Sequence, residues 1–376
     1  MKRLRCALVL CLAAEAIFAC SSDYRIWIPR SPSADPLYRF INGDKAGYID
    51  QRGKIVIPAT LPHWGGNSGG EFHNGLLELA VSNGVYIDAT GKRVIDKGLY
   101  RGWDFSVGLA VAMRKGENKW GYIDKTGEFV IRPQFDTFPN GYVWPFEDGF
   151  AKIEVAGRLG YIDHSGKFAI PPQLLDAESF ANGMARVIVE GPCVYVKTES
   201  ACPNLSVVPK GTKEDSKLPA CKHTFIDKSG RVITSQRYED ARNFAEGLAP
   251  VRVGGFWGYI DEEGKMSILP RFDTAESFAD GLAVVSERGM YGFIDHTGSY
   301  AIRPQWKSAD EFVEGRAVVG DGNMFWYIDH DGRQAIPGKF EAASPFFKGL
   351  AHVAISGQHS FAYIDRTGKR VFVYKP

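Results

Sequence analysis

The residues most suggestive of chemistry form a short recurring run of an aromatic residue, isoleucine and aspartate. Within Phe256–Phe272 the run reads Trp-Gly-Tyr-Ile-Asp and is followed by Glu262 and Glu263. Carboxylates so close together could supply a general acid and base, or oxygen ligands for a cation. The sequence "DHDG" at 329–332 also has the acidic spacing with which a calcium-binding loop begins. Both chemistries require that these aspartates belong to one particular site rather than recur in every unit of a repeat.

Nine copies of the triplet occur along the chain, which indicates a repeat rather than one active site. Successive copies lie 34 to 39 residues apart, except for one gap of 64 residues. Each aspartate precedes a glycine by three residues, with apolar residues on both sides. In such a hairpin turn the carboxylate accepts backbone N–H groups and the glycine takes a positive φ. We therefore predict a structural turn role for Asp50, Asp88, Asp124, Asp163, Asp227, Asp261, Asp295, Asp329 and Asp365.

The rival chemistries lack their remaining residues. The turn at 329–332 has no later bidentate glutamate, and the equivalent turns "DATG" and "DKSG" have no second carboxylate. His164, His296 and His330 each follow a turn aspartate, so they lie about one repeat apart, too far to share one metal ion. No G-x-S-x-G, H-E-x-x-H or paired C-x-x-C motif occurs. The sequence therefore predicts no catalytic residue, no cofactor and no metal.

The elements that position these turns are strands. Eight F-x-x-G motifs lie between the triplets, and each is followed by an alternating apolar run typical of a half-buried strand. In one unit we expect three strands, "LAVV", "WGYID" and "KMSILP", the last ending at Pro270 because proline cannot donate to a ladder. The linker "RFDTAESFADG" that follows is expected to hold one helical turn.

Two segments carry a family resemblance. "KWGYIDKTGEFVIRPQFD" at 119–136 and "FWGYIDEEGKMSILPRFD" at 256–273 resemble WG-repeat sequences, which are common in bacterial proteins. The resemblance covers about residues 37–376. It implies a β-rich repeat scaffold used for binding, and it brings no catalytic residues with it.

The expected architecture is an all-β tandem array of about nine three-stranded β-meander repeats. Three strands cannot bury both faces alone, so each unit must pack on the next. The chain holds whole units with none split between its two ends, whereas propellers often close by completing one blade from both ends, and their blades usually have four strands. This favours an open, curved solenoid, with a closed propeller-like ring as the alternative.

The first residues have the layout of an export signal. A basic start (Lys2, Arg3, Arg5) precedes a short apolar stretch at 6–14. The run Ile17-Phe18-Ala19-Cys20 resembles a bacterial lipobox, which would make Cys20 the lipidated first residue of the mature chain; cleavage after Ala16 is the alternative. We predict a signal peptide at 1–19, a linker at 20–36 and a repeat domain at 37–376. The expected location is extracytoplasmic, in a bacterial envelope, either lipid-anchored or periplasmic or secreted.

The 64-residue gap contains an insertion at about 190–223, where the first strand of a unit should turn into the second. It is rich in Pro, Lys and Ser and holds Cys193, Cys202 and Cys221. Secreted chains favour disulfides, and Cys193 and Cys221 lie near the two ends of the insertion, so we predict that this pair is bridged. The cysteine spacings do not match those of a zinc knuckle.

These observations favour a non-enzymatic extracytoplasmic scaffold that contacts a protein partner, with the insertion as the irregular contact. The 45 basic and 44 acidic residues give a net charge of +1, which disfavours nucleic acid, and membrane contact is expected only through the lipid anchor. One alternative is a carbohydrate-binding or cell-wall-binding lipoprotein, because aromatic rings stack on sugars. The less regular tryptophans open to that role are Trp27, Trp64, Trp103, Trp144 and Trp306. A third alternative is an unrecognised hydrolase.

Overall fold

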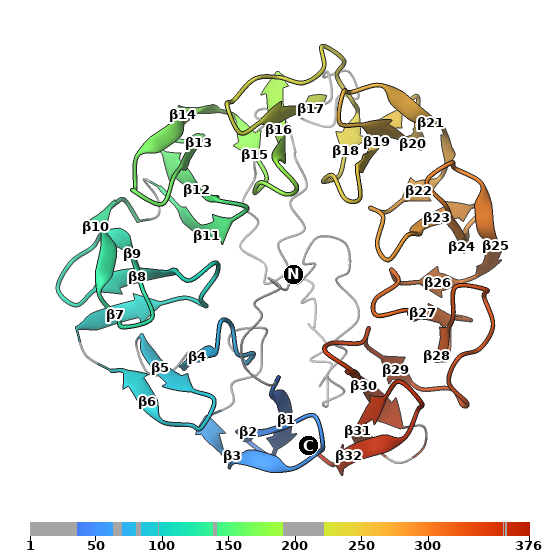
Figure 1. The fold of residues 1–376 in the computed structure, drawn as a ribbon, viewed down its shortest axis with the longest axis horizontal. Coiled ribbons are helices and arrows are strands. Elements are labelled where there is room, and N and C mark those ends of the chain that lie inside the picture. The colour runs from blue at the N-terminus through green and yellow to red at the C-terminus, as the bar shows by residue number, and fades with distance from the viewer. Residues whose placement is uncertain are drawn as a thin grey trace, which may run out of the picture.

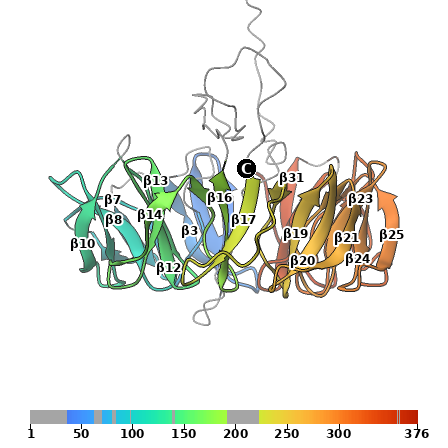
Figure 2. The same cartoon turned by 90° about the horizontal axis from the view of Figure 1, so that it is seen from above.

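The computed structural model describes residues 36–62, 70–79, 84–96, 98–137, 141–190, 222–355, 357 and 359–376. None of these residues is helical, and they contain 32 strands in nine small antiparallel sheets. Figure 1 shows the sheets arranged as blades around one axis, with the first blade beside the last. Figure 2 shows the same ring from the side, one blade thick. The predicted signal peptide, linker and Cys20 precede residue 36 and lie outside the described part of the chain.

Each complete blade has four strands in sequence order from the axis outward (Figure 1). The inner strands are β7 (Leu99–Gly102), β11 (Val143–Glu147), β15 (Asp176–Ala177), β18 (Asp240–Ala241), β22 (Thr274–Ala275), β26 (Ser308–Ala309) and β29 (Ala342–Ala343). The second strands are β1 (Tyr38–Asn42), β4 (Leu76–Leu79), β8 (Ala110–Arg114), β12 (Phe150–Val155), β16 (Met184–Glu190), β19 (Leu248–Val253), β23 (Ala283–Glu287), β27 (Ala317–Gly320) and β30 (Leu350–Ile355).

The third and outer strands complete the blades. The third strands carry the aromatic-Ile-Asp triplet, and they are β2 (Lys45–Ile49), β5 (Val85–Asp88), β9 (Trp120–Ile123), β13 (Arg158–Ile162), β17 (Lys222–Asp227), β20 (Phe256–Asp261), β24 (Met290–Ile294), β28 (Phe325–Ile328) and β31 (Ser360–Asp365). The outer strands are β3 (Ile55–Pro62), β6 (Arg93–Ile95), β10 (Phe129–Phe135), β14 (Phe168–Leu174), β21 (Met266–Phe272), β25 (Tyr300–Trp306) and β32 (Arg370–Tyr374). We number the blades 1 to 9 in this order.

The linker expected to hold a helical turn instead supplies the inner strand. In blade 7 only two residue pairs join this strand to its neighbour, Thr274 with Ser286 and Ala275 with Val285. A two-residue strand is too short to show alternation in the sequence. The expectation of three-stranded units was therefore wrong for blades 3, 4, 6, 7 and 9, which have four strands.

The glycine of the Trp-Gly pair is required by a bulge in the outer strand. A Cβ on Gly258 would lie 2.4 Å from the carbonyl oxygen of Ile268 and 2.7 Å from the nitrogen of Pro270. The ladder between β20 and β21 shifts register at this point, and β21 continues past the proline to Phe272. Pro270 thus lies in a bulge, where no ladder donor is needed, and the predicted strand end at this residue was wrong.

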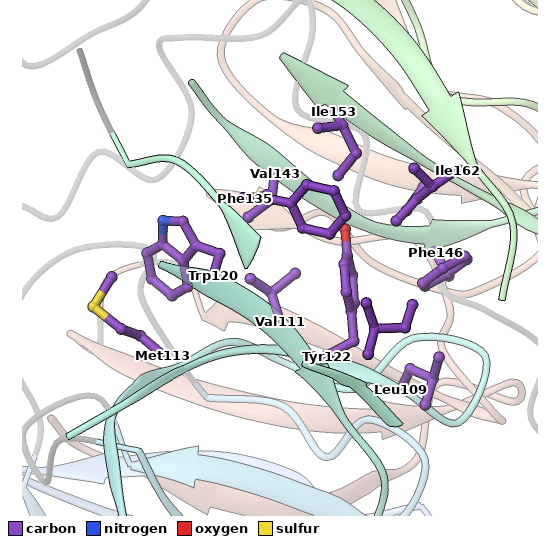
Figure 3. Packing of buried hydrophobic residues seen from close by; sticks show 12 residues of the cluster. Leu109, Val111, Met113, Trp120, Tyr122, Phe135, Val143, Phe146, Ile153 and Ile162 are labelled. Atoms are coloured by element: carbon purple, nitrogen blue, oxygen red, sulfur yellow. The ribbon is translucent and has the colours of Figure 1, made fainter. Parts of the chain in front are cut away.

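The hydrophobic core lies between the blades rather than within any one of them. The cluster in Figure 3 combines Val111, Trp120 and Tyr122 of blade 3 with Phe146 and Ile162 of blade 4. The Tyr122 ring meets the Phe146 ring edge-on at 4.9 Å between centroids, and its hydroxyl donates to the carbonyl of Trp144 at 2.7 Å. The repeated tyrosine and the F-x-x-G phenylalanine are therefore partners across neighbouring blades.

The same contacts join the last blade to the first, so the ring is closed. The Tyr363 hydroxyl donates to the carbonyl of Arg39 at 2.6 Å, and its ring lies 5.4 Å from that of Tyr38. The rings of Phe40 and Phe372 lie 5.0 Å apart. The open solenoid predicted from the sequence was wrong and the closed ring, given as the alternative, is observed. The ring closes between whole blades, so the lack of a split blade did not indicate an open array.

Candidate binding surface at the inner turns

Two sets of turns lie on one face of the ring. In an antiparallel blade the connection between the first and second strands and the connection between the third and fourth strands lie at the same end. The F-x-x-G motif makes the first connection, here called the inner turn, and D-x-x-G makes the second, here called the outer turn. We call this end of the blades the turn face. The end of β16, the beginning of β17 and the end of β32 lie at the opposite face.

Each inner turn is a two-residue hairpin that projects one variable side chain. In blade 7, Ala279 and Leu282 exchange backbone hydrogen bonds of 2.9 and 3.2 Å around Asp280 and Gly281. Both central residues have positive φ, 55° and 85°, as a type I′ turn requires. The variable position before the glycine is occupied by Asn74, Val107, Asp148, Asn182, Glu246, Asp280, Glu314 and Lys348.

Acidic residues at the variable position connect neighbouring blades. The Glu314 carboxylate accepts the N–H of Gly349, the equivalent glycine one blade further, at 3.0 Å. The same bond joins Asp148 to Gly183, Glu246 to Gly281 and Asp280 to Gly315. The amide of Asn182 instead donates to the carbonyl of Phe244 at 2.8 Å. The turn face is therefore a ring of hydrogen-bonded hairpins whose side chains are held in register.

In several blades the residue after the outer-turn aspartate contacts these hairpins. The His296 ring stacks on Phe278 of its own blade at 4.2 Å, and its Nε2 lies 3.2 Å from the Glu246 carboxylate of the blade before. His330 stacks on Phe312 and contacts the carbonyl of Asp280 at 2.9 Å. At the same position of other blades, Lys228 forms an ion pair with Asp148 and Arg366 forms one with Glu314. The His164 ring stacks on the Phe146 ring. The three histidines lie on different blades.

The nine turn aspartates have hydrogen-bonding partners within their own turns. Asp50 Oδ1 accepts the N–H groups of Arg52 and Lys54, both at 2.9 Å. The other eight make the equivalent two bonds. Where a serine or threonine follows two positions later, its hydroxyl also donates. That bond is the main cause that holds the pKa below its ordinary value at Asp88, Asp124, Asp163, Asp227 and Asp295.

A polar cluster lies beside the apolar contact between blades 5 and 6, where the Phe225 and Phe244 rings meet at 4.9 Å. His223 occupies the tryptophan position of its repeat and is buried, with Nδ1 3.0 Å from the Arg186 guanidinium. Arg186 also pairs with Glu178 at 2.6 Å, and Asp240 of blade 6 lies 4.0 Å from His223 Nε2. Burial, followed by the charge of Arg186, lowers the pKa of His223 to about 4. The imidazole is therefore neutral at pH 7, at the end of the blade from which the insertion leaves.

The tryptophans considered for sugar stacking differ in their surroundings. Trp306 is buried, whereas Trp103 is 37% exposed and meets Trp120 edge-on at 5.8 Å. Trp144 is partly buried, with Lys152 Nζ 4.4 Å from the ring centroid. Trp27, Trp64, Cys193, Cys202 and Cys221 lie outside the described residues, so the predicted bridge stays a prediction. In the described part of the chain no three His, Cys, Asp or Glu side chains group as a metal site.

Sequence reasoning missed the variable position of the inner turn. The F-x-x-G motif was recognised, yet the residue before its glycine was given no role. A signal was available, because four of the eight residues there are Asn or Asp, types that tolerate the backbone conformation of such turns. The bond to the next blade could not be foreseen, because it depends on which blades are neighbours in space.

Similarity to known proteins agrees with this geometry. The model of the family described as "WG containing repeat" matches residues 120–158, 160–191, 224–255, 257–291, 291–324 and 327–357, which together make up more than half of the chain. A search of curated proteins found no match. A solved structure titled "Crystal structure of the eukaryotic initiation factor" is 11% identical, with 91% of this chain and 96% of that chain covered and a TM-score of 0.59. The structure of Citrobacter koseri AztD is 11% identical over 90% of this chain and 94% of its own, with a TM-score of 0.41.

The fold and the turn face define a closed β-propeller built from one repeated motif. The chain belongs to the WG-containing repeat family, as the matches over blades 3 to 9 show. The likeness to the initiation factor, at 11% identity, concerns the fold alone. No helix in the described part of the chain is long and apolar enough to cross a membrane.

Proposed function

We propose that this protein is a non-enzymatic, extracytoplasmic scaffold that binds a protein partner at the inner turns. The observation that carries the proposal is the ring of hairpins on the turn face. One backbone geometry is repeated there, while the side chain at the variable position changes from blade to blade. Repeat proteins use such in-register positions for recognition, since the scaffold fixes the place and the sequence varies the chemistry.

The arc formed by blades 6 to 8 offers a specific chemistry to a partner. Glu246, Asp280 and Glu314 follow one another there, and the exposed rings of His296 and His330 lie between them. The carboxylates already accept glycine N–H groups, so a partner would meet an ordered surface rather than mobile side chains. A segment that donates hydrogen bonds and carries positive charge suits this arc.

Site-specific photocrosslinking tests the proposed contact. Benzoylphenylalanine at position 330 faces the proposed partner side. The same probe in place of the exposed Asn323 lies in the turn between the second and third strands of the same blade, at the opposite face. In an envelope extract we expect one dominant protein adduct from position 330 and none from position 323. An adduct from position 323 alone, or partner capture abolished by deletion of 192–220, would move the contact away from the turn face.

The envelope location has its own test. We propose that Cys20 carries the lipid, because it follows a lipobox-like run. Labelled palmitate should enter the wild-type chain in a bacterial host and should be absent from a Cys20→Ser variant. Label found in neither chain would favour cleavage after Ala16 and a periplasmic or secreted protein. Label retained in the variant would place the lipid on another residue and would contradict the assignment to Cys20.

A second candidate function is carbohydrate or cell-wall binding, which the partly exposed Trp103 favours. This residue is 37% exposed and lies beside Trp120, so a sugar face could stack there. Intrinsic fluorescence titrated with a glycan and peptidoglycan panel should then change in the wild type and not in Trp103→Leu. No change with any glycan would remove this candidate.

A further inference from the structure

Cations and exposed apolar side chains gather on the outer turns of one continuous arc of the ring. Three positions of each outer turn vary, namely the two residues between the aspartate and the glycine and the residue after the glycine. In blades 9, 1, 2, 3, 4 and 5 these positions hold nine cations and one carboxylate. In blades 6, 7 and 8 they hold two cations and three carboxylates. These nine cations are Arg366, Lys369, Arg52, Lys54, Lys92, Lys125, Lys167, Lys228 and Arg231. The turn aspartate is common to all nine blades, so it does not alter the contrast.

Most of these cations form no ion pair with the described residues, although the charges of Lys92, Lys167 and Lys369 help to lower the pKa of the aspartate in their own turns. Lys228, Arg231 and Arg366 form ion pairs with Asp148, Asp227 and Glu314. The other six are exposed and form no ion pair with the described residues. Their charge is therefore available to an anionic surface outside the protein.

Large apolar residues are exposed directly after the same turns. Val130 is 53% exposed and Ile55 is 48% exposed, both at the beginning of outer strands. Val56, Val94, Phe168 and Val232 are exposed at the corresponding places of blades 1, 2, 4 and 5. The equivalent positions of blades 6 to 8 hold Met266, Ser267, Tyr300, Ala301, Gln334 and Ala335, none of which is an exposed large apolar residue. Directly after the outer turns, positive charge and exposed large apolar residues thus coincide in blades 1 to 5. Blade 9 has Arg370 and the partly buried Val371 there, and Leu269 of blade 6, 74% exposed, lies further along its outer strand.

We propose that this arc is a bilayer-facing surface that binds anionic phospholipid headgroups and inserts its apolar side chains between them. Cations beside aliphatic and aromatic residues are the composition of interfacial membrane contacts. The chain also enters the ring at the turn face of blade 1, inside this arc, because Pro36 directly precedes β1. A lipid on Cys20, 16 residues upstream, would tether that face to the membrane. Since the fold closes, blades 9 and 1 to 5 form one uninterrupted arc.

Vesicle flotation tests the proposal without the lipid anchor. Every joint of the ring is made by residues 36–376, so a chain beginning at residue 20 with Cys20→Ser keeps the whole fold and cannot be acylated. We expect it to float with phosphatidylglycerol-rich vesicles, to stay behind with pure phosphatidylcholine, and to be released by raised salt. Lys54→Glu, Lys92→Glu and Lys167→Glu together should lower partitioning at least about tenfold. Val94→Ser with Val130→Ser should lower it less and leave the salt dependence unchanged.

The control variant changes the same turn position on the other arc. Lys265→Glu with Arg333→Glu should leave flotation as in the wild type, and all variants should melt at the wild-type temperature. Equal loss in this control, or equal binding to neutral vesicles, would overturn the proposal. Retention on immobilised polyglutamate without flotation would assign the arc to an acidic protein and would also overturn it. The assay contains no protein partner and no acyl chain, so its failure leaves the proposed scaffold function and the lipid anchor to their own tests.

Discussion

The joint between blades 9 and 1 and the joints inside the chain carry out the same task with different residues. At four internal joints a carboxylate of one inner turn accepts the glycine N–H of the next. The closing joint cannot make this bond, because Lys348 has no carboxylate and Pro36, in the glycine position, has no N–H. Instead, the carbonyl of Lys348 accepts the hydroxyl of Tyr38 at 2.7 Å and the amide of Gln51 at 2.9 Å.

The tyrosine bond differs in a related way. At an internal joint the Tyr259 hydroxyl donates to the backbone carbonyl of Glu276. This residue lies two positions before Phe278, the inner-turn phenylalanine of the next blade. At the closing joint the Tyr363 hydroxyl donates to the backbone carbonyl of Arg39, which lies on β1, the second strand of blade 1. The contact type is therefore conserved while its partner moves by one strand. The joint between blades 9 and 1 is thus hydrogen-bonded like the others, but its donors are the side chains of Tyr38, Gln51 and Tyr363.

The largest effect that should distinguish the closing joint comes from a glycine in its outer turn. Gly53 has φ +82° and a Cβ there would lie 2.5 Å from the carbonyl oxygen of Val371 in blade 9. Gly75 has φ +86°, and a Cβ added there would have no atom within 4 Å, so its substitution measures the cost of the backbone conformation alone. Gly53→Ala should lower the free energy of unfolding by about 3 kcal/mol and Gly75→Ala by about 1–2 kcal/mol in denaturant titrations. Equal losses would mean that blades 9 and 1 do not touch.

Acid should weaken the closing joint through His352, whose ring lies 5.0 Å from that of Tyr363. Burial, followed by the charge of Arg39, lowers the pKa of His352 to about 4, below its ordinary value of 6.5. The stability from this neutral ring is present above pH 6.5 and is lost as the pH falls toward 4. We expect a loss of about 2 kcal/mol over that window in the wild type beyond that in His352→Phe. Parallel pH profiles for the two proteins would contradict this assignment.

A smaller change compares the two tyrosine bonds directly. Tyr363→Phe removes the hydroxyl that reaches Arg39, and Tyr259→Phe removes its internal counterpart. Each should lower the free energy of unfolding by about 1 kcal/mol, because one buried hydrogen bond is lost and the ring contact stays. Urea titration of the pair gives the comparison. A cost at Tyr259 with none at Tyr363 would indicate that the ring is open in solution.

The smallest expected effect concerns the exposed carboxylate bonds. Glu314→Gln keeps the shape but weakens the contacts with Gly349 and Arg366. Its cost should be about 0.5 kcal/mol and should decrease at high salt, as for other solvent-exposed ion pairs. Thermal melts at two salt concentrations measure this. A salt-independent loss above about 2 kcal/mol would show that this joint depends on more than a surface pair.

The sequence determines the repeat unit more fully than the assembly. The aspartate and glycine of each outer turn specify the local geometry of that turn. A pattern such as Asp50 with Gly53 therefore predicts the turn from four residues alone. The inner strand is different, since Thr274 and Ala275 become a strand only because β23 lies beside them. Closure is still less local, because Arg39 and Tyr363 are 324 residues apart. The variable inner-turn residues, such as Asp280, acquire their contacts only in the assembled ring.

Hydrogen exchange after removal of the last strand tests the closed ring most directly. β32 packs on blade 1 through Phe372 and Val371, so a chain ending at residue 369 should lose protection in β1 to β3 as well as in blade 9. Blades 5 and 6, across the ring, should stay protected, because repeat units depend mainly on their neighbours. Unchanged protection in β1 to β3, eight blades away along the chain, would contradict closure.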